Sequence, residues 1–449
     1  TSNWRNSVIS SQTNQRYRVT DTGLERLESD LGARPMTAPD TLRDFVTYCA
    51  DRYPANRYAL TFWDHGGGSL TGYGYDQVFP REGSMSIDEI DAALAGAGVT
   101  FDWIGFDACL MATLETAYMA NRHADYMIAS EETEPGIGWY YTDWLTALSA
   151  DPSMPTSDIG RRIIDSFTAK CAQETPRDTT TLSLIDLVAL NNSVDGAFRA
   201  FASASDAQLD QDYKVVSDAR GNAREFSKSK LDQVDLIDLA QNIDSPEART
   251  LIDALGQSIL YNRTSANLTR AHGISIYFPY DELTNLSSML SVYDRIGMGE
   301  EYTGLVRKFA NRVVGGQITT SGSANAFGSL TGSTGGTPSG SASDLWAIAW
   351  NAFFANADYN RFAGSGDGAR PAWIDEDQIL AGADYYQSHY LNAGDLVLTR
   401  KGDTQVLRLS DEQWDLVQSI DLNLFYDDGE GYIDLGLDAV WEFDDDGDL

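Results

Sequence analysis

Two runs of strand-forming residues with a helix between them constrain the fold of this chain more than any other feature. The first run, residues 58–63, is aromatic and apolar and stops at His65 and a row of three glycines. The second run, residues 101–106, stops just before Cys109. The stretch between them opens with a capping-box pattern and predicts a helix over 86–94. A strand, a helix and a strand in this order predict a right-handed crossover between two parallel strands.

His65 and Cys109 therefore fall at the carboxyl ends of neighbouring parallel strands, where open sheets gather their ligands. Cys109 is predicted to open a helix from Leu110 to about Arg122, whose amino-terminal dipole would favour the thiolate. A histidine within reach can take the thiol proton, and backbone N–H groups in the glycine turn can hold an oxyanion. Taken singly, each residue is typical of a structural role. Together they predict an acyl-transfer site.

Four ordered motifs extend this pattern. They are Asp-His-Gly-Gly-Gly at 64–68, Gly-Phe-Asp-Ala-Cys-Leu-Met at 105–111, Ala-Ser-Glu-Glu-Thr-Glu-Pro-Gly at 129–136 and His-Gly-Ile-Ser-Ile-Tyr-Phe-Pro at 272–279. In these motifs the chain resembles the clostripain family of cysteine peptidases, over about residues 1–310. The resemblance implies the caspase-like α/β fold that this family shares with gingipains and legumain, with an open, mostly parallel sheet flanked by helices.

The resemblance also implies roles for individual residues. Cys109 would be the nucleophile, His65 the other half of a catalytic dyad, and the amides of Gly66 and Cys109 the oxyanion donors, with no third catalytic residue. Similar enzymes cut after Arg or Lys, and the acidic residue tied to that choice is here Asp107. A carboxylate in a partly desolvated pocket binds a guanidinium through charge-assisted hydrogen bonds. The alternative for Asp107 is to cap the helix that Cys109 is predicted to open.

Three glutamates after a further predicted strand, Glu131, Glu132 and Glu134, are candidates to line a pocket that accepts cations. A solvated loop is the alternative for this segment. Three aromatic residues that follow, Trp139, Tyr140 and Trp144, either wall a substrate cleft or pack in the core.

Arg81 is the single basic residue between His65 and Cys109. It stands in a predicted loop, and exposed loops attract proteolytic nicking. Zymogens that this chain resembles are activated by cleavage after a basic residue between the catalytic His and Cys. The resemblance therefore implies self-processing after Arg81, whereas the alternative is an uncut loop with a solvated arginine.

The net charge of the chain limits the classes of molecule that it can bind. A net charge of −35 over 449 residues excludes nucleic acids and anionic membrane surfaces, which require a basic face. No run approaches the roughly 18 apolar residues that span a bilayer. A negative field would help to draw in basic peptides. We therefore expect protein or peptide substrates that carry Arg or Lys, no nucleic acid, no membrane insertion, and a monomer or a self-cleaved two-chain form.

The cysteines and the acidic runs predict no metal site. Cys49, Cys109 and Cys171 match no metal-binding array, and at least one must stay free. Acidic runs at 427–431 and 444–448 resemble calcium loops but lack the ligand spacing, which favours hairpin turns. The predicted chemistry requires no cofactor, and the resemblance adds Ca²⁺ only as an activator.

Strands and helices continue to alternate through the first 314 residues, as in an α/β fold. The predicted core strands cover 125–129, 182–186 and 273–278. The predicted helices cover 159–168, 187–203 and 245–261. His272, beside the last of these strands, is interpreted as a structural residue.

Composition divides the chain into three parts. Residues 1–314 are the predicted catalytic domain, 315–343 a Gly/Ser/Thr-rich linker, and 344–449 an acidic, mostly β accessory domain. The chain carries no initiator methionine or signal peptide, and the first strand and helix of similar catalytic domains are missing. We therefore expect a processed product or a fragment, from a secreted or surface-attached bacterial protein.

Two other functional classes stay open. The His-Gly-Gly-Gly turn also occurs in the oxyanion hole of some lipases, but that fold needs a Gly-x-Ser-x-Gly elbow, which the sequence lacks. A catalytically inactive relative that serves as a binding or adhesion protein would suit the acidic tail, although the intact pair of Cys109 and His65 argues against it.

Overall fold

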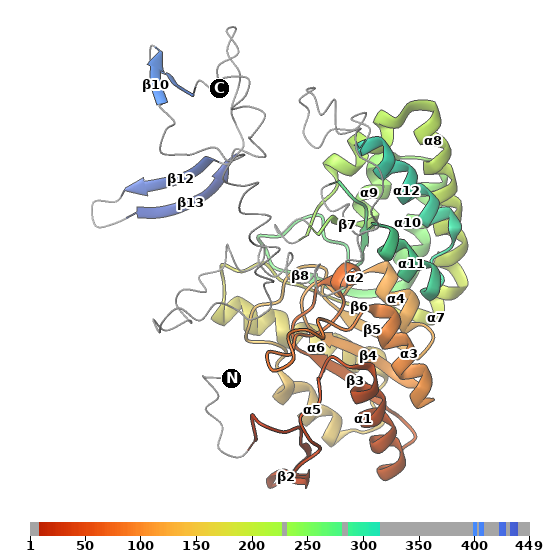
Figure 1. The fold of residues 1–449 in the computed structure, drawn as a ribbon, viewed down its shortest axis with the longest axis vertical. Helices are drawn as coiled ribbons and strands as arrows, with labels where there is room; N and C mark the ends of the chain where they lie inside the picture. Colours follow the sequence, from red (N-terminus) through yellow and green to blue (C-terminus); the bar gives the residue numbers. More distant parts are fainter. Residues whose placement is uncertain are drawn as a thin grey trace, which may run out of the picture. The chain divides into compact units, whose positions relative to one another are not determined.

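A five-stranded sheet with the strand order β3-β4-β5-β6-β8 lies at the centre of the first part of the chain (Figure 1). Strands β3, β4 and β5 are parallel, β6 is antiparallel to β5, and β8 is antiparallel to β6. Four of the five strands therefore run in one direction, which confirms the mostly parallel sheet. The strands are Ala59–Trp63, Phe101–Asp107, Ala124–Ala129, Thr181–Asp186 and Ile259–Thr264.

The computed structural model describes residues 9–226, 231–280 and 286–314, together with four strands between 398 and 438. The chain divides into two compact units, Thr1–Ser365 and Gly366–Leu449. The predicted linker at 315–343 lies outside the described residues, so the predicted domain boundaries stay predictions.

The predicted crossover is present between β3 and β4. Its helix, α3, covers Ile87–Ala97, and the capping box between Ser86 and Glu89 is formed as expected. The helix ends at Ala97, three residues later than predicted, and is followed by Gly98, whose φ of 66° is a left-handed conformation that glycine adopts without strain. The two strands pair in a register that sets Trp63 opposite Asp107.

Alternate side chains of the strands face two separate hydrophobic cores. On β4, Ile104 and Phe106 pack into the core that includes residues of α1 (Pro39–Arg52) and α3, whereas Trp103 packs against residues of α6 (Thr156–Glu174). This period of two indicates a sheet that is covered by helices on both faces. Trp139 and Trp144 belong to the second core, which supports the core-packing alternative for both.

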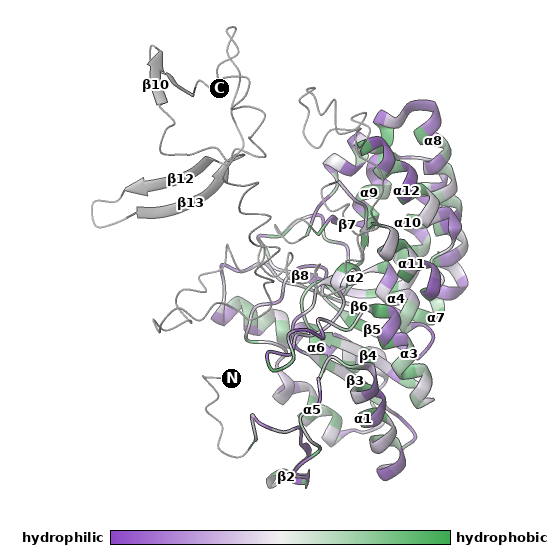
Figure 2. Ribbon diagram, viewed as in Figure 1, coloured by the Kyte–Doolittle hydropathy of each residue, from purple (hydrophilic) through white to green (hydrophobic). Residues whose placement is uncertain are grey.

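Helix α2 covers Gly68–Thr71, and the remaining helices of this unit cover residues 114 to 314. Figure 2 shows hydrophilic residues along much of α8. No helix among the described residues is long and apolar enough to cross a membrane. These helices are α4 (Leu114–Ala120), α5 (Tyr141–Ala150), α7 (Leu187–Ala189) with a π-helical turn at Leu190–Val194, α8 (Asp195–Asn222), α9 (Leu236–Ile243), α10 (Pro246–Ser258), α11 (Leu286–Ile296) and α12 (Glu300–Val314).

Two predicted elements differ from the structure. The predicted helix over 245–261 stops at Ser258, and the next residue begins β8. A short apolar run in the sequence does not by itself distinguish a helix from a strand, and here pairing with β6 makes it a strand. The predicted core strand at 273–278 is β9 (Ser275–Tyr277), which pairs with β7 (Gln233–Asp235) in a separate two-stranded sheet.

Short hairpins complete the described structure. β1 (Arg16–Thr20) and β2 (Gly23–Glu28) form one near the amino terminus. In the second unit, β10 (Leu398–Lys401) pairs with β11 (Thr404–Leu407), and β12 (Leu422–Asp427) pairs with β13 (Tyr432–Asp438).

Candidate active site

The turns that carry His65 and Cys109 are in direct contact. Because Trp63 is paired with Asp107, the two candidate residues each lie two positions beyond a paired residue of parallel strands. The main chain of the two turns meets at Gly66, where an added Cβ atom would stand 2.1 Å from the carbonyl oxygen of Cys109. A side chain cannot be accommodated at that distance, so glycine is required for the contact.

The amide of Gly66 is not used within the glycine turn. The amide of Gly67 donates to Gly72 O (2.9 Å), and that of Gly74 donates to His65 O (2.8 Å). These two bonds flank Gly66, so its own N–H faces away from the returning chain at Tyr73. Among the described residues the Gly66 N–H has no hydrogen-bond acceptor. The geometry suits the oxyanion role that the sequence predicts for Gly66.

The helix predicted to begin at Cys109 is not present there. Helix α4 begins at Leu114, because the side chain of Thr113 accepts the Thr116 N–H (3.0 Å) and caps it. Leu110 has a φ of +66°, a left-handed conformation that breaks the predicted helix. The prediction that a helix dipole favours the Cys109 thiolate is therefore wrong. The capping alternative for Asp107 is also wrong, since no helix starts beside it.

Cys109 and His65 are both in their neutral forms in this environment. Burial, with smaller effects of the Glu134 and Glu132 charges, raises the pKa of Cys109 to about 12, although an N–H of Glu134 donates to its Sγ atom (3.2 Å). Burial lowers the pKa of His65 below its usual value of 6.5, and the neighbouring Asp64 opposes this only in part. A neutral imidazole within reach of a neutral thiol can accept the thiol proton.

Asp64 has a structural part in this site that the sequence analysis did not assign. Its carboxylate accepts the N–H of His65 (2.7 Å) and the N–H of Tyr75 (3.1 Å). It thereby ties the end of β3 to the returning chain of the turn. An aspartate directly before a glycine-rich turn is a signal for such a bond, because its side chain often accepts main-chain N–H groups.

Asp107 and Glu134 form a buried pair of carboxyl groups beside Cys109. Asp107 is 4% exposed and accepts hydrogen bonds from the Trp139 N–H (3.2 Å) and the Tyr141 hydroxyl (2.9 Å). Trp139 Nε1 also donates to Glu134 (3.4 Å). Burial raises the pKa of Asp107, and burial together with the Asp107 charge raises that of Glu134 well above its usual value. No cationic side chain pairs with either carboxyl among the described residues.

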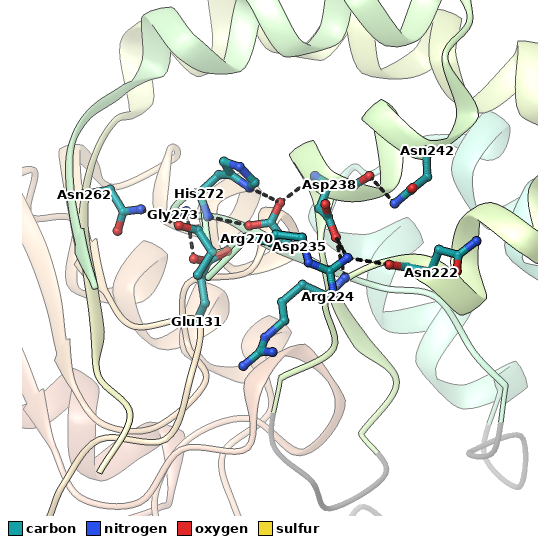
Figure 3. Close-up of polar contacts among 11 residues, drawn as sticks. Glu131, Asn222, Arg224, Asp235, Asp238, Asn242, Asn262, Arg270, His272 and Gly273 are labelled. Carbon is teal, nitrogen blue, oxygen red and sulfur yellow. Dashed lines mark hydrogen bonds and ion pairs between the residues drawn. The ribbon is translucent and has the colours of Figure 1, made fainter. Parts of the chain in front are cut away.

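The other two glutamates do not join this pair. Glu131 is fully buried, and its carboxyl accepts the Gly273 N–H (2.8 Å) and lies beside Asp235 (Figure 3). Glu132 is 8% exposed and accepts the Thr133 N–H (2.9 Å). The solvated-loop alternative is therefore wrong for both.

Arg81 lies at an exposed loop tip, as the sequence predicts. The Glu82 N–H donates to Phe79 O (3.0 Å), and the Ser84 hydroxyl donates to Gly74 O (2.6 Å). The bond from Ser84 thus anchors the carboxyl-terminal end of the Arg81 loop to the glycine turn.

His272, interpreted as a structural residue, has a clear partner, since its Nδ1 atom contacts Asp235 (2.9 Å). Cys49, Cys109 and Cys171 are all free thiols. Cys171 is buried, whereas Cys49 is only partly buried.

Comparison with known proteins identifies the family. Residues 11–295, more than half of the chain, match the model of the clostripain family. Clostripain from Hathewaya histolytica is 30% identical over 123 residues, which are 24% of this chain and 23% of that protein. The matched region thus spans less than a quarter of the length of this relative.

Two solved structures are also similar. A secreted C11 cysteine protease from Bacteroides thetaiotaomicron, in complex with an irreversible peptide inhibitor, has 21% identity and a TM-score of 0.47, with 64% of this chain and 85% of that chain covered. An inactive zymogen C11 protease from Parabacteroides distasonis has 20% identity and a TM-score of 0.48, with 64% and 83% covered. On the match of the family model, this chain belongs to the clostripain family.

Proposed function

We propose that this chain is a cysteine endopeptidase that cleaves after Arg or Lys through a dyad of Cys109 and His65. The observation that carries the proposal is the backbone contact between the two turns at Gly66, which holds a neutral imidazole and a thiol at the same sheet edge. Membership of the clostripain family supports it. Stoichiometric labelling of Cys109 by an arginyl acyloxymethylketone, located by peptide mass spectrometry, tests it. Absence of label from folded protein would favour an inactive relative.

In the proposed reaction His65 takes the proton from Cys109 Sγ, and the thiolate attacks the carbonyl carbon of the scissile bond. The oxyanion accepts hydrogen bonds from the N–H groups of Gly66 and Cys109. The imidazolium returns its proton to the leaving amine, and a water molecule, deprotonated by the same imidazole, hydrolyses the thioester. Because the pKa of Cys109 is raised to about 12, the thiol depends on this base for its activation.

The buried pair of Asp107 and Glu134 supports the proposed preference for a basic residue. Two carboxyl groups in a poorly solvated site cannot easily both be charged, so the pair retains a proton until a cation arrives. An arriving guanidinium would replace that proton and bind through charge-assisted hydrogen bonds. Tyr141 and Trp139 hold the Asp107 carboxylate in place.

Self-processing after Arg81 and secretion are further parts of the proposal. The exposure of Arg81 at a loop tip supports cleavage there. Cleavage after Arg81 would divide the loop that connects the glycine turn to α3. The proposed chemistry uses no cofactor, and Ca²⁺ enters only as an activator.

A further inference from the structure

Three ionisable side chains from distant parts of the sequence, Glu131, Asp235 and His272, lie close together (Figure 3). Glu131 follows β5, Asp235 caps α9, and His272 lies just before β9. Glu131 and Asp235 are fully buried, whereas the His272 side chain is 33% exposed. The dyad proposed above does not use this cluster.

The hydrogen bonds show which of the two carboxyl groups holds a proton. Asp235 accepts three N–H groups, from Asp238 N (2.7 Å), His272 N (2.5 Å) and His272 Nδ1 (2.9 Å). Glu131 accepts only one, from Gly273 N, and its Oε1 atom is buried without an N–H or O–H donor. Two adjacent buried carboxylates would repel each other strongly. The carboxyl with fewer hydrogen-bond donors, Glu131, is therefore the one that holds a proton.

The charges around the cluster agree with this assignment. Burial and the Asp235 carboxyl raise the pKa of Glu131 well above its usual value, with Glu132 as a further negative neighbour. The hydrogen bond to Asp235 raises the pKa of His272, which also faces Asp238 and Arg270.

His272 and Arg270 offset the charges of Asp235 and Asp238, since Arg270 contacts Asp238 (3.2 Å). Arg224 donates its main-chain N–H to Asp238 (2.6 Å) but forms no ion pair among the described residues. An ionised Glu131 would be an uncompensated charge.

The loop that carries Glu131 also holds the main chain around Cys109. Ala112 N donates to Ser130 O (2.8 Å), and Leu110 N donates to Glu132 O (3.2 Å). Two residues further on, the Glu134 N–H donates to Cys109 Sγ. Glu131 lies between these contacts and fastens the same loop to Gly273 from the other side.

We propose that Glu131 is a positioning residue, a neutral acid that locks the 130–134 loop against Cys109 and releases it on losing its proton. This role rests on the proposed function of Cys109 as the nucleophile. It differs from the direct contact with substrate that the sequence suggests for Glu131, because the Glu131 carboxyl faces Asp235 and Gly273 instead of Asp107.

The test compares Glu131→Gln with Glu131→Leu across pH. Glutamine can accept from Gly273 and donate to Asp235 without titrating, whereas leucine can do neither. We expect kcat/KM to fall at least tenfold further in Glu131→Leu than in Glu131→Gln. In the parent enzyme kcat/KM should fall as pH rises through the raised pKa of Glu131, and Glu131→Gln should lack this limb. Glu115→Gln is the matched control, since Glu115 is also buried with a raised pKa but lies in α4.

A second readout does not depend on catalysis. Difference infrared spectra of inactive Cys109→Ala protein at neutral pH should show a protonated carboxyl band that Glu131→Gln removes. Persistence of that band, or equal loss of activity in both Glu131 variants, would overturn the positioning role. Loss of Arg-over-neutral selectivity in Glu131→Gln would return Glu131 to substrate binding. An active Cys109→Ala enzyme would instead overturn the dyad, and the infrared result would be unaffected.

Discussion

Two buried carboxyl pairs flank the 130–134 loop, and they differ in whether the protein supplies a cation. The pair of Asp235 and Glu131 has His272 beside it and accepts the main-chain N–H groups of Asp238, His272 and Gly273. The pair of Asp107 and Glu134 has only neutral donors, Trp139 and Tyr141, among the described residues. The first pair is electrostatically complete without a ligand. We propose that the second pair, which lies next to Cys109, is completed by a cation of the substrate.

The largest expected effect removes the chemistry that both pairs serve. Cys109→Ala takes away the nucleophile, and His65→Ala leaves a thiol of pKa about 12 without a base. Each change should lower kcat by several orders of magnitude, because paired nucleophile and base act as a unit. Hydrolysis of an arginyl peptide by purified variants measures this. Full activity of Cys109→Ala, blocked only by serine reagents, would refute the dyad.

The next effect separates the two pairs directly. Asp107→Asn removes the proposed countercharge for the substrate, which costs on the order of 2–5 kcal/mol for a desolvated ion pair. Arginyl substrates should lose this amount and alanyl substrates should not. Glu134→Gln should act in the same direction, whereas Glu131→Gln should leave selectivity unchanged. Selectivity that survives both Asp107→Asn and Glu134→Gln would place the specificity site elsewhere.

Self-processing is the third prediction. Active protein should consist of two associated chains with a new amino terminus at Glu82, and Cys109→Ala protein should stay intact. Arg81→Ala should remain a single chain of low activity, because the loop stays tied to the glycine turn through Ser84. Amino-terminal sequencing and intact-mass measurement decide this. An uncut Arg81→Ala protein with full activity would show that the loop is no switch.

The fall of kcat/KM at acid pH should contain two parts. His65 must be neutral to act as base, and its lowered pKa places this limb below pH 6.5. Asp107 and Glu134 must lose a proton to bind a cation, and their raised pKa values add a second limb for arginyl substrates only. The pH profile of kcat/KM in Asp107→Asn, with a neutral substrate, should retain the His65 limb alone. An unchanged two-part profile in that variant would contradict the assignment.

The sequence was sufficient where neighbouring residues determine the structure. The strand ends before His65 and Cys109 and the capping box at Ser86 are local signals, and each is present. The start of α4 was missed because Leu110 adopts a positive φ, and no local pattern favours that conformation for leucine. Thr113, with Thr116 three residues on, was an available capping signal.

The direction of the glutamate side chains could not be predicted from their own motif. Glu131 turns away from Asp107 because its partners, Asp235 and Gly273, are more than a hundred residues later in the chain. Asp235 lies at the end of a three-residue strand that the sequence analysis did not recognise, although an aspartate three positions before Asp238 is a common helix start. The sequence grouped three neighbouring glutamates, whereas the fold distributes them between different sites.

The smallest predicted effect is on stability, and it isolates Glu131 from every catalytic assumption. Below pH 4.5 the residue is protonated in both folded and unfolded protein. As pH rises above 4.5 it ionises in the unfolded chain but stays protonated in the folded one, so the free energy of unfolding falls until the raised folded-state pKa is passed. Each unit by which the pKa is raised changes this free energy by about 1.4 kcal/mol. Glutamine does not titrate, so Glu131→Gln should gain stability relative to the parent as pH rises from 4.5. Urea unfolding of Cys109→Ala protein with and without Glu131→Gln measures the difference, and a difference independent of pH would mean that Glu131 is already ionised beside Asp235.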